Sequence, residues 1–417
     1  MFELKKFYKI FINILIIIIS FIIILTNYEK KNFNRINIRE QKKFNFNLDK
    51  IYTNKILFFE KINDYIRICR KGILINDINY NNTITPKITA IIPVFNAFKT
   101  IKYAIRSIQN QNMSDIEIIL VDDVSTDNSL EIIEELMLED KRIKLIKNKE
   151  NKGILYSRSI GALTAKGKYI MALDNDDLFI YGIFNKAYED AEQNNIDILE
   201  FSGIQLCHNC LANMNKIYIP YYLRFKENGL IVKQPELSKF IYIKKNGLYS
   251  YDFNDVFVWG KLIKTEIYKK AVKLLGNFIY DYKIFLTEDK IFTVAIYKVA
   301  NSFRFIDIYG IIYIENQYSV CHSWLKSKKQ RILTDFLLFA IIYYEITKDS
   351  EEIQIIVEDL KIRYNEYNTV LEGKYEKLFI ELYNNILKCK NILDSEKQIL
   401  INLIIQSNKT NSQNKEI

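Results

Sequence analysis

Carboxylates gather at the ends of apolar segments in the first half of the chain. Asp174 and Asp176 stand one residue apart, directly after the apolar run from Tyr169 to Leu173. Two carboxylates at this spacing can hold Mg²⁺ or Mn²⁺ while water and phosphate fill the other positions of the ion. Such an ion would neutralise a departing diphosphate. A turn without a metal is the alternative, because Asp and Asn also stabilise turns.

A second acidic pair, Asp122 and Asp123, ends the apolar run over 116–121. These side chains could accept hydrogen bonds from a nucleotide base or a ribose. The alternative is a helix cap, which they would share with the Ser and Asp that follow.

The elements that must position these pairs follow from the periodicity of the chain. Short apolar runs alternate with segments of helical spacing. We expect strands over 88–94, 116–121, 143–146 and 169–173, and helices over 97–111, 128–138 and 153–166. This alternation predicts an α/β fold with a parallel sheet covered on both faces. Ligands bind such sheets at the carboxyl ends of the strands, which is where both acidic pairs lie.

Four segments resemble the donor-binding half of the family 2 glycosyltransferases, which adopt the GT-A fold. In the family's order and spacing, they read IIPVFN, LVDDVSTDNS, NKGILYSRSIGA and YIMALDNDD, and cover about residues 88–200. The resemblance implies a GT-A-type, mostly parallel sheet flanked by helices. It also implies an enzyme that uses a nucleotide-sugar donor, with a UDP-sugar favoured.

The resemblance also assigns donor-side residues by position. It places at the nucleotide sugar Pro93, Phe95, Asn96, Asp122, Asp123, Arg158, Asp174 and Asn175. Asp122 would bind uracil or an equivalent base, and Asp174 with Asp176 would hold the metal, Asp176 by direct contact. Arg158 would help to hold the donor region together, whereas an Arg on the helix surface is the alternative. Val124 departs from the family pattern, which usually has Gly or a small residue there.

Two later segments also resemble the family. VWGKL resembles its W-x-K-L segment, which assigns acceptor binding to Trp259 and Lys261. TEDKIF resembles its E-D-x-x-F motif, so that Asp289 would be the base that takes the proton from the acceptor hydroxyl, with Glu288 orienting it or the acceptor. The alternative is that both acidic residues merely begin a helix, which negative charge favours.

His322 lies where many relatives carry polar residues on a loop over the diphosphate, and it is a candidate metal ligand. The pattern QxxRW, typical of processive polymerases, is not seen, which argues against a polysaccharide synthase with its own channel.

The implied reaction is an inverting, Mn²⁺- or Mg²⁺-assisted transfer to a hydroxyl of a glycan, lipid or protein. A protein that keeps the fold and binds nucleotide sugars without turnover is one alternative. A nucleotidyltransferase is another, but it would be expected to show a Gly-rich phosphate loop, and PVFNAFKT contains no glycine.

Residues 10–26 form an uncharged apolar run near the lower length limit of a membrane span. We expect an uncleaved single-pass anchor between a tail (1–9) and a stalk or linker (27–86), with a signal peptide as the alternative. Lys and Arg after the run favour a cytosolic catalytic part. The layout resembles Golgi enzymes, however, so we expect the Golgi or ER in a eukaryote and otherwise the cytoplasmic face of the inner membrane.

The catalytic domain is expected over 87–325, with a donor-binding half (87–200) and an acceptor half (201–325). A helical region (326–405) and a polar tail (406–417) would follow. The net charge of +9 comes from Lys and Arg scattered among acidic residues, so nucleic-acid binding is not expected. Cys207 and Cys210 have CxxC spacing, but a single such pair is a poor metal signal; a disulfide or two plain thiols fit equally.

Overall fold

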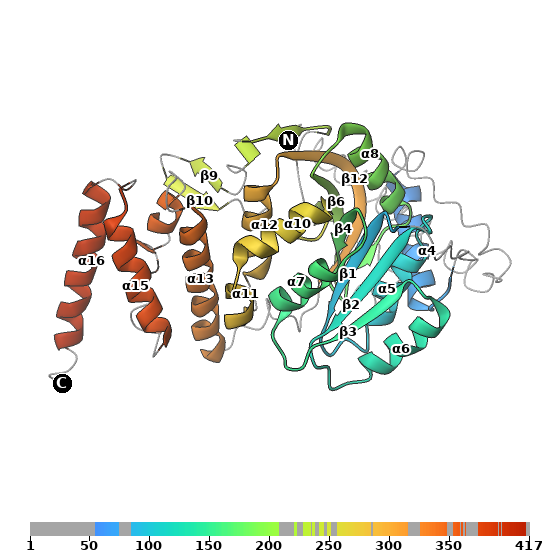
Figure 1. Ribbon diagram of the computed structural model, residues 1–417, viewed down its shortest axis with the longest axis horizontal. Helices are drawn as coiled ribbons and strands as arrows, with labels where there is room; N and C mark the ends of the chain where they lie inside the picture. The colour runs from blue at the N-terminus through green and yellow to red at the C-terminus, as the bar shows by residue number, and fades with distance from the viewer. Residues whose placement is uncertain are drawn as a thin grey trace, which may run out of the picture.

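A computed structural model gives the architecture of the chain (Figure 1). The described residues are 55–74, 85–207, 221–222, 228–234, 236–237, 242–245, 248–251, 257–284, 287–315, 326–347, 353–358, 360–361, 363, 374–390, 392 and 394–413. The predicted anchor over 10–26, the candidate ligand His322, and Cys210 lie outside these residues.

Four parallel strands form the donor half of the sheet, in the order β3-β2-β1-β4. These strands are β1 (Ile88–Val94), β2 (Ile116–Asp122), β3 (Ile143–Lys147) and β4 (Tyr169–Ala172). The helices between them are α5 (Ile101–Gln109), α6 (Ser129–Glu139) and α7 (Ile154–Thr164). Every residue of β1 and β2 is buried, because helices cover both faces. Ile91 packs in one apolar cluster with Leu155 of α7, whereas its neighbour Ile92 packs in another with Ile105 of α5.

The rest of the sheet is mixed, which corrects the expectation of a mostly parallel sheet. β11 (Lys261–Lys264) runs antiparallel to both β4 and β6 (Ile198–Cys207), while β12 (Ser302–Glu315) runs parallel to β6. The expectation extended the pattern of the donor half, where each strand is followed by a helix that covers the sheet. β4 is followed instead by a turn, and the chain reaches β11 after a small hairpin.

Shorter strands complete this part of the fold. They are β5 (Leu178–Phe179), β7 (Tyr221–Tyr222), β8 (Ile231–Lys233), and the separate hairpin of β9 (Tyr242–Lys245) and β10 (Leu248–Tyr251). The helices here are α8 (Ile183–Asn194), α10 (Thr265–Leu275), α11 (Phe278–Asp281) and α12 (Glu288–Val299). Among them, α12 packs against both α10 and α7.

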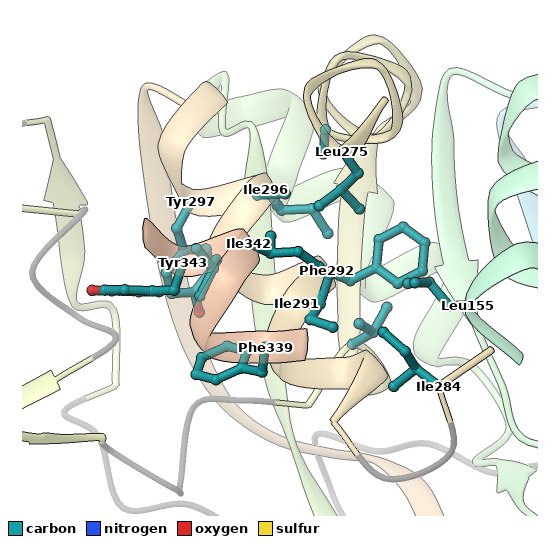
Figure 2. Packing of buried hydrophobic residues seen from close by; sticks show 14 of the residues in the cluster. Leu155, Leu275, Ile284, Ile291, Phe292, Ile296, Tyr297, Phe339, Ile342 and Tyr343 are labelled. Atoms are coloured by element: carbon teal, nitrogen blue, oxygen red, sulfur yellow. The ribbon is translucent and has the colours of Figure 1, made fainter. Parts of the chain in front are cut away.

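Among the described residues after β12, the long helices are α13 (Lys326–Thr347), α15 (Lys374–Lys388) and α16 (Asp394–Gln413). They extend away from the sheet beyond α12 (Figure 1). One apolar cluster nevertheless continues from Ile91 in β1 through Phe292 and Leu337 to Leu400 in α16. Figure 2 shows part of this packing, with side chains of α12 facing those of α13. The C-terminal helices therefore share a core with the catalytic part.

The region interpreted as a linker contains a packed helix, α4 (Lys55–Arg70). The Tyr65 hydroxyl donates a hydrogen bond of 2.9 Å to the backbone carbonyl of Ser107. Ile66 is buried with Leu178 and Ile312 of the sheet. This corrects the linker assignment for 55–70. The apolar pattern of this helix extends over few residues, and the Asn- and Lys-rich sequence around it obscures the helical period.

Within the part of the chain that the structure describes, no helix combines the length and apolar character needed to cross a bilayer.

Candidate active site

The first loop of the site follows β1 and is tied to the loop after β2. Asn96 adopts a left-handed backbone (φ 51°). Its side-chain oxygen accepts a hydrogen bond of 2.8 Å from the backbone amide of Thr126, and the backbone amide of Asn96 donates to Ser125 Oγ at 3.0 Å. Phe95 beside it leaves 49% of its surface exposed. Asn96 therefore fixes the loop, while the Phe95 ring is open to a ligand.

The carboxylates after β2 are both occupied by donors of the chain itself. Asp122 accepts the amides of Val124 and Ser125, each at 3.2 Å. Asp123 accepts the amides of Lys152 and Gly153 at 2.8 and 2.7 Å. The helix-cap interpretation is wrong for Asp123, because its carboxylate binds the loop before α7 rather than the start of α6. Base binding by Asp122 stays a prediction.

Val124 has a backbone conformation that suits glycine. Its φ is 66°, in the left-handed region, and its side chain is 38% exposed. For a β-branched residue this conformation is a steric outlier. The departure from the family pattern noted in the sequence therefore falls on a strained residue of the turn after β2.

Arg158 joins the donor side of the site to the acceptor side. Its guanidinium, 1% exposed, lies 2.5 Å from Asp174 Oδ1 and 2.5 Å from Asp289 Oδ1. Glu288 Oε1 lies 3.7 Å away. The alternative of a helix-surface Arg is wrong, because this side chain is buried between the end of β4 and the start of α12.

Burial and mutual charge shift the proton affinities of this group. Burial raises the pKa of Glu288 well above its usual value, and the charge of Asp289 adds to the rise. Burial also raises the pKa of Asp289, although the Arg158 charge opposes it. The pKa of Arg158 is raised, since its carboxylate neighbours outweigh the burial that lowers it. A carboxylate with raised proton affinity beside a fixed cation is suited to accept a proton.

The turn after β4 carries the candidate metal ligands. Asp174 and Asp176 are half-buried. The Asn175 side chain donates to the Pro93 carbonyl at 3.1 Å, which ties the turn to the end of β1. Asp177, which the sequence interpretation left without a role, is fully buried and accepts the Ile314 amide of β12 at 2.8 Å. Its place in the DNDD run was the signal that could have found it.

The described residues contain no group of three or more His, Cys, Asp or Glu side chains arranged to hold a metal. Mg²⁺ and Mn²⁺ bound with a diphosphate need only one or two protein carboxylates, since phosphate and water supply the rest. Asp174 and Asp176 meet that requirement, although Asp174 also pairs with Arg158. The residues present therefore fit such an ion.

Trp259 and Lys261, predicted to bind the acceptor, are buried in the structure. The Lys261 ammonium lies 3.0 Å from Glu200 Oε2 and donates to the Phe257 carbonyl at 2.6 Å. The Trp259 ring, 3% exposed, stacks on Phe257 and on Tyr313, with centroids 4.7 and 5.7 Å away. These contacts give both residues a structural role; acceptor binding by them stays a prediction.

Comparisons with known proteins agree with this geometry. The profile of the family described as "Glycosyl transferase family 2" matches residues 89–210. The uncharacterized glycosyltransferase EpsJ of Bacillus subtilis is 29% identical over 56% of this chain and 63% of its own length. An uncharacterized glycosyltransferase of Haemophilus influenzae is 30% identical over 45% of this chain and 85% of its own. The match thus spans somewhat under two thirds of EpsJ.

A solved structure shows a similar fold. S. aureus TarS 1–349 in complex with UDP-GlcNAc superposes with a TM-score of 0.50 at 17% identity, over 75% of this chain and 83% of that one. The fold and the sequence matches agree on the class of protein. The chain belongs to glycosyltransferase family 2.

Proposed function

We propose that this enzyme transfers a sugar from a UDP-sugar to an acceptor hydroxyl with inversion at the anomeric carbon, assisted by Mn²⁺ or Mg²⁺ at Asp174 and Asp176. The observation that carries the proposal is the double contact of Arg158. One guanidinium holds a carboxylate from the end of β4 and another from the start of α12, each at 2.5 Å. One side chain, that of Arg158, therefore bridges a donor-side carboxylate and the potential base.

The acceptor side of the reaction follows from Asp289. Its carboxylate takes the proton of the acceptor hydroxyl as the oxygen attacks the anomeric carbon. The bond from that carbon to the diphosphate oxygen breaks, and UDP leaves with the electron pair. A single displacement without an enzyme nucleophile inverts the anomeric centre. A bound divalent cation would supply charge stabilisation to the leaving diphosphate.

The donor side is supported by the loops after β1 and β2. Phe95 offers an exposed ring beside the fixed Asn96, where a base could stack. TarS, whose fold is similar, is described in complex with UDP-GlcNAc, which favours UDP over GDP as the nucleotide. An anchor over 10–26 would hold this site near a membrane, and that stays a prediction from the sequence.

Donor hydrolysis by the purified full-length protein tests the donor and metal assignments. A panel of UDP- and GDP-sugars is supplied with Mn²⁺, and release of UDP or GDP is measured with and without EDTA. We expect metal-dependent release from one UDP-sugar, reduced about 100-fold or more in Asp176→Asn. The matched control is Asp394→Asn, at a fully exposed position in α16, which should behave as the wild type.

Three outcomes would contradict this assignment. Release that resists EDTA would remove the metal from the proposal. Binding of UDP without release from any donor would favour the non-catalytic alternative, and absence of both would refute the donor class.

The base is tested by transfer to synthetic acceptors, for which a panel of p-nitrophenyl glycosides serves. Asp289→Asn is expected to lower the transfer rate by about 10²–10⁴-fold, because a positioned base contributes that much. Affinity for UDP, measured by calorimetry, should change little. Transfer at the wild-type rate in this variant would exclude Asp289 as the base.

A further inference from the structure

The helix that carries Glu288 and Asp289 is tied at its start to another part of the chain. Thr287 occupies the residue before the first turn of α12, where a Thr hydroxyl ordinarily accepts a hydrogen bond from an amide of that turn. Here its side chain makes no such bond. The hydroxyl instead donates to the backbone carbonyl of Asp335 in α13, at 3.0 Å, and Thr287 is 1% exposed. The start of α12 is thus tied to another helix.

A further contact joins the start of α12 to the middle of α13. The Lys290 ammonium of the first turn of α12 lies 4.9 Å from the centre of the Phe336 ring in α13. The Arg363 guanidinium lies 4.0 Å from the same ring. Such cation–ring contacts add to packing where the groups are partly desolvated. The Lys290 contact therefore reinforces the junction that the Thr287 bond makes, and Arg363 packs on the same ring.

Apolar packing makes the rest of this junction rigid. Figure 2 shows Phe339 and Ile342 of α13 beside Ile291 and Ile296 of α12, and all four side chains belong to one buried cluster. Close-packed side chains transmit a displacement rather than absorb it. A shift of α13 would therefore move the start of α12, where the two carboxylates stand.

We propose that Thr287 is a positioning residue: its hydrogen bond to Asp335 of α13 sets where the carboxylates of Glu288 and Asp289 lie relative to Arg158. The inference rests on the proposed role of Asp289 as the base. It extends the functional framework to α13, which lies beyond the residues that match the family profile. A displacement of about 1 Å at a reacting group can cost about 100-fold in rate, so loss of the Thr287 hydrogen bond should lower the rate of the reaction.

Three variants of the full-length protein test this role. Thr287→Val keeps the shape and removes the hydroxyl, and Thr287→Ser keeps the hydroxyl. The matched control is Thr347→Val, because the buried Thr347 hydroxyl also donates to a backbone carbonyl of α13, that of Tyr343 at 2.6 Å, at the C-terminal end of the helix.

Transfer to the p-nitrophenyl glycosides is the first measurement. We expect kcat to fall about tenfold in Thr287→Val, while the KM for donor and the affinity for UDP stay unchanged. Thr287→Ser should recover kcat to within about twofold, and Thr347→Val should match the wild type. A Ser variant as slow as the Val variant, or a slow Thr347→Val, would overturn the proposal.

Amide hydrogen exchange is the second measurement, and it needs no substrate. Thr287→Val should speed exchange in the first turn of α12, whereas Thr347→Val should not. Unchanged exchange there would overturn the proposal whatever the activity. A wild-type enzyme that releases no UDP from any donor would contradict the proposed function alone, since the exchange result stands without a donor.

Discussion

Three carboxylates and one guanidinium meet where β4 ends and α12 begins. Arg158 lies 2.5 Å from both Asp174 and Asp289, and farther from Glu288. Glu288 Oε2 is buried and has no hydrogen-bond partner among the residues that the structure describes. One positive charge does not balance three neighbouring carboxylates, of which Glu288 is buried and the other two are half-buried, so the least well paired carboxyl retains its proton most strongly.

The pH dependence of stability should reveal this proton. The pKa of Glu288 in the folded protein lies well above the ordinary 4.5, so between these two values the folded state binds more protons than the unfolded state. The free energy of unfolding of the wild type therefore falls as the pH rises through that window. Glu288→Gln removes this loss, and its gain over the wild type, measured by urea denaturation, should grow as the pH rises above the ordinary pKa of 4.5. The same change at exposed Glu135 should give no pH-dependent gain; an equal gain at both would assign the effect to overall charge.

Strain at Val124 leads to a second expectation at this scale. A left-handed conformation costs a residue with a Cβ about 1–2 kcal/mol, while glycine loses about 0.5–1 kcal/mol in added chain entropy. Val124→Gly should therefore raise the free energy of unfolding by about 0.5–1 kcal/mol. Val124→Ala keeps the Cβ and should gain less. A loss of stability in the Gly variant would show that the exposed Val side chain makes compensating contacts.

At the scale of helices and strands, the sequence predicted the donor half closely. The expected strand over 88–94 is β1, and the expected helix over 153–166 contains α7. These elements have strong local signals: fully apolar strands, helical spacing and short connections. β11 and β12 have no comparable signal, because their pairing depends on contacts far along the chain. Likewise the sequence predicted that the candidate residues gather at the strand ends. It did not predict the burial of Lys261 against Glu200, because tertiary packing decides that contact.

The packing of α7 on the sheet gives a prediction for an element. A Cβ added at Gly161 would lie 2.6 Å from Ile91 Cγ2 and 3.4 Å from Val121 Cγ2. Overpacking of a core costs about 1–3 kcal/mol, which exceeds the gain of about 1 kcal/mol in helix propensity. Gly161→Ala should therefore lower the free energy of unfolding. Leu163→Ala, on the exposed side of α7, should change it by less than about 0.5 kcal/mol.

At the scale of the whole molecule, α4 belongs to the folded unit. Its removal would uncover apolar side chains of the sheet, including Leu178, Ile204 and Ile312. A chain beginning at residue 87 should therefore melt at least about 5 °C below one beginning at residue 55, since burial of a few such side chains contributes several kcal/mol. Circular dichroism melting of both chains measures this. Equal melting temperatures would mean that α4 contributes no net stability.

The apolar cluster that runs from Ile91 to Leu400 also orders the events of biosynthesis. A ribosome delivers the donor half early, but the face of α12 that packs on α13 has no cover until residues 326–347 have left the exit tunnel. The nascent chain therefore carries uncovered apolar surface from the synthesis of α12 until α13 can pack on it. Such surface recruits chaperones and promotes aggregation. Because Leu400 belongs to the same core, this apolar cluster becomes fully packed only when α16 has been translated.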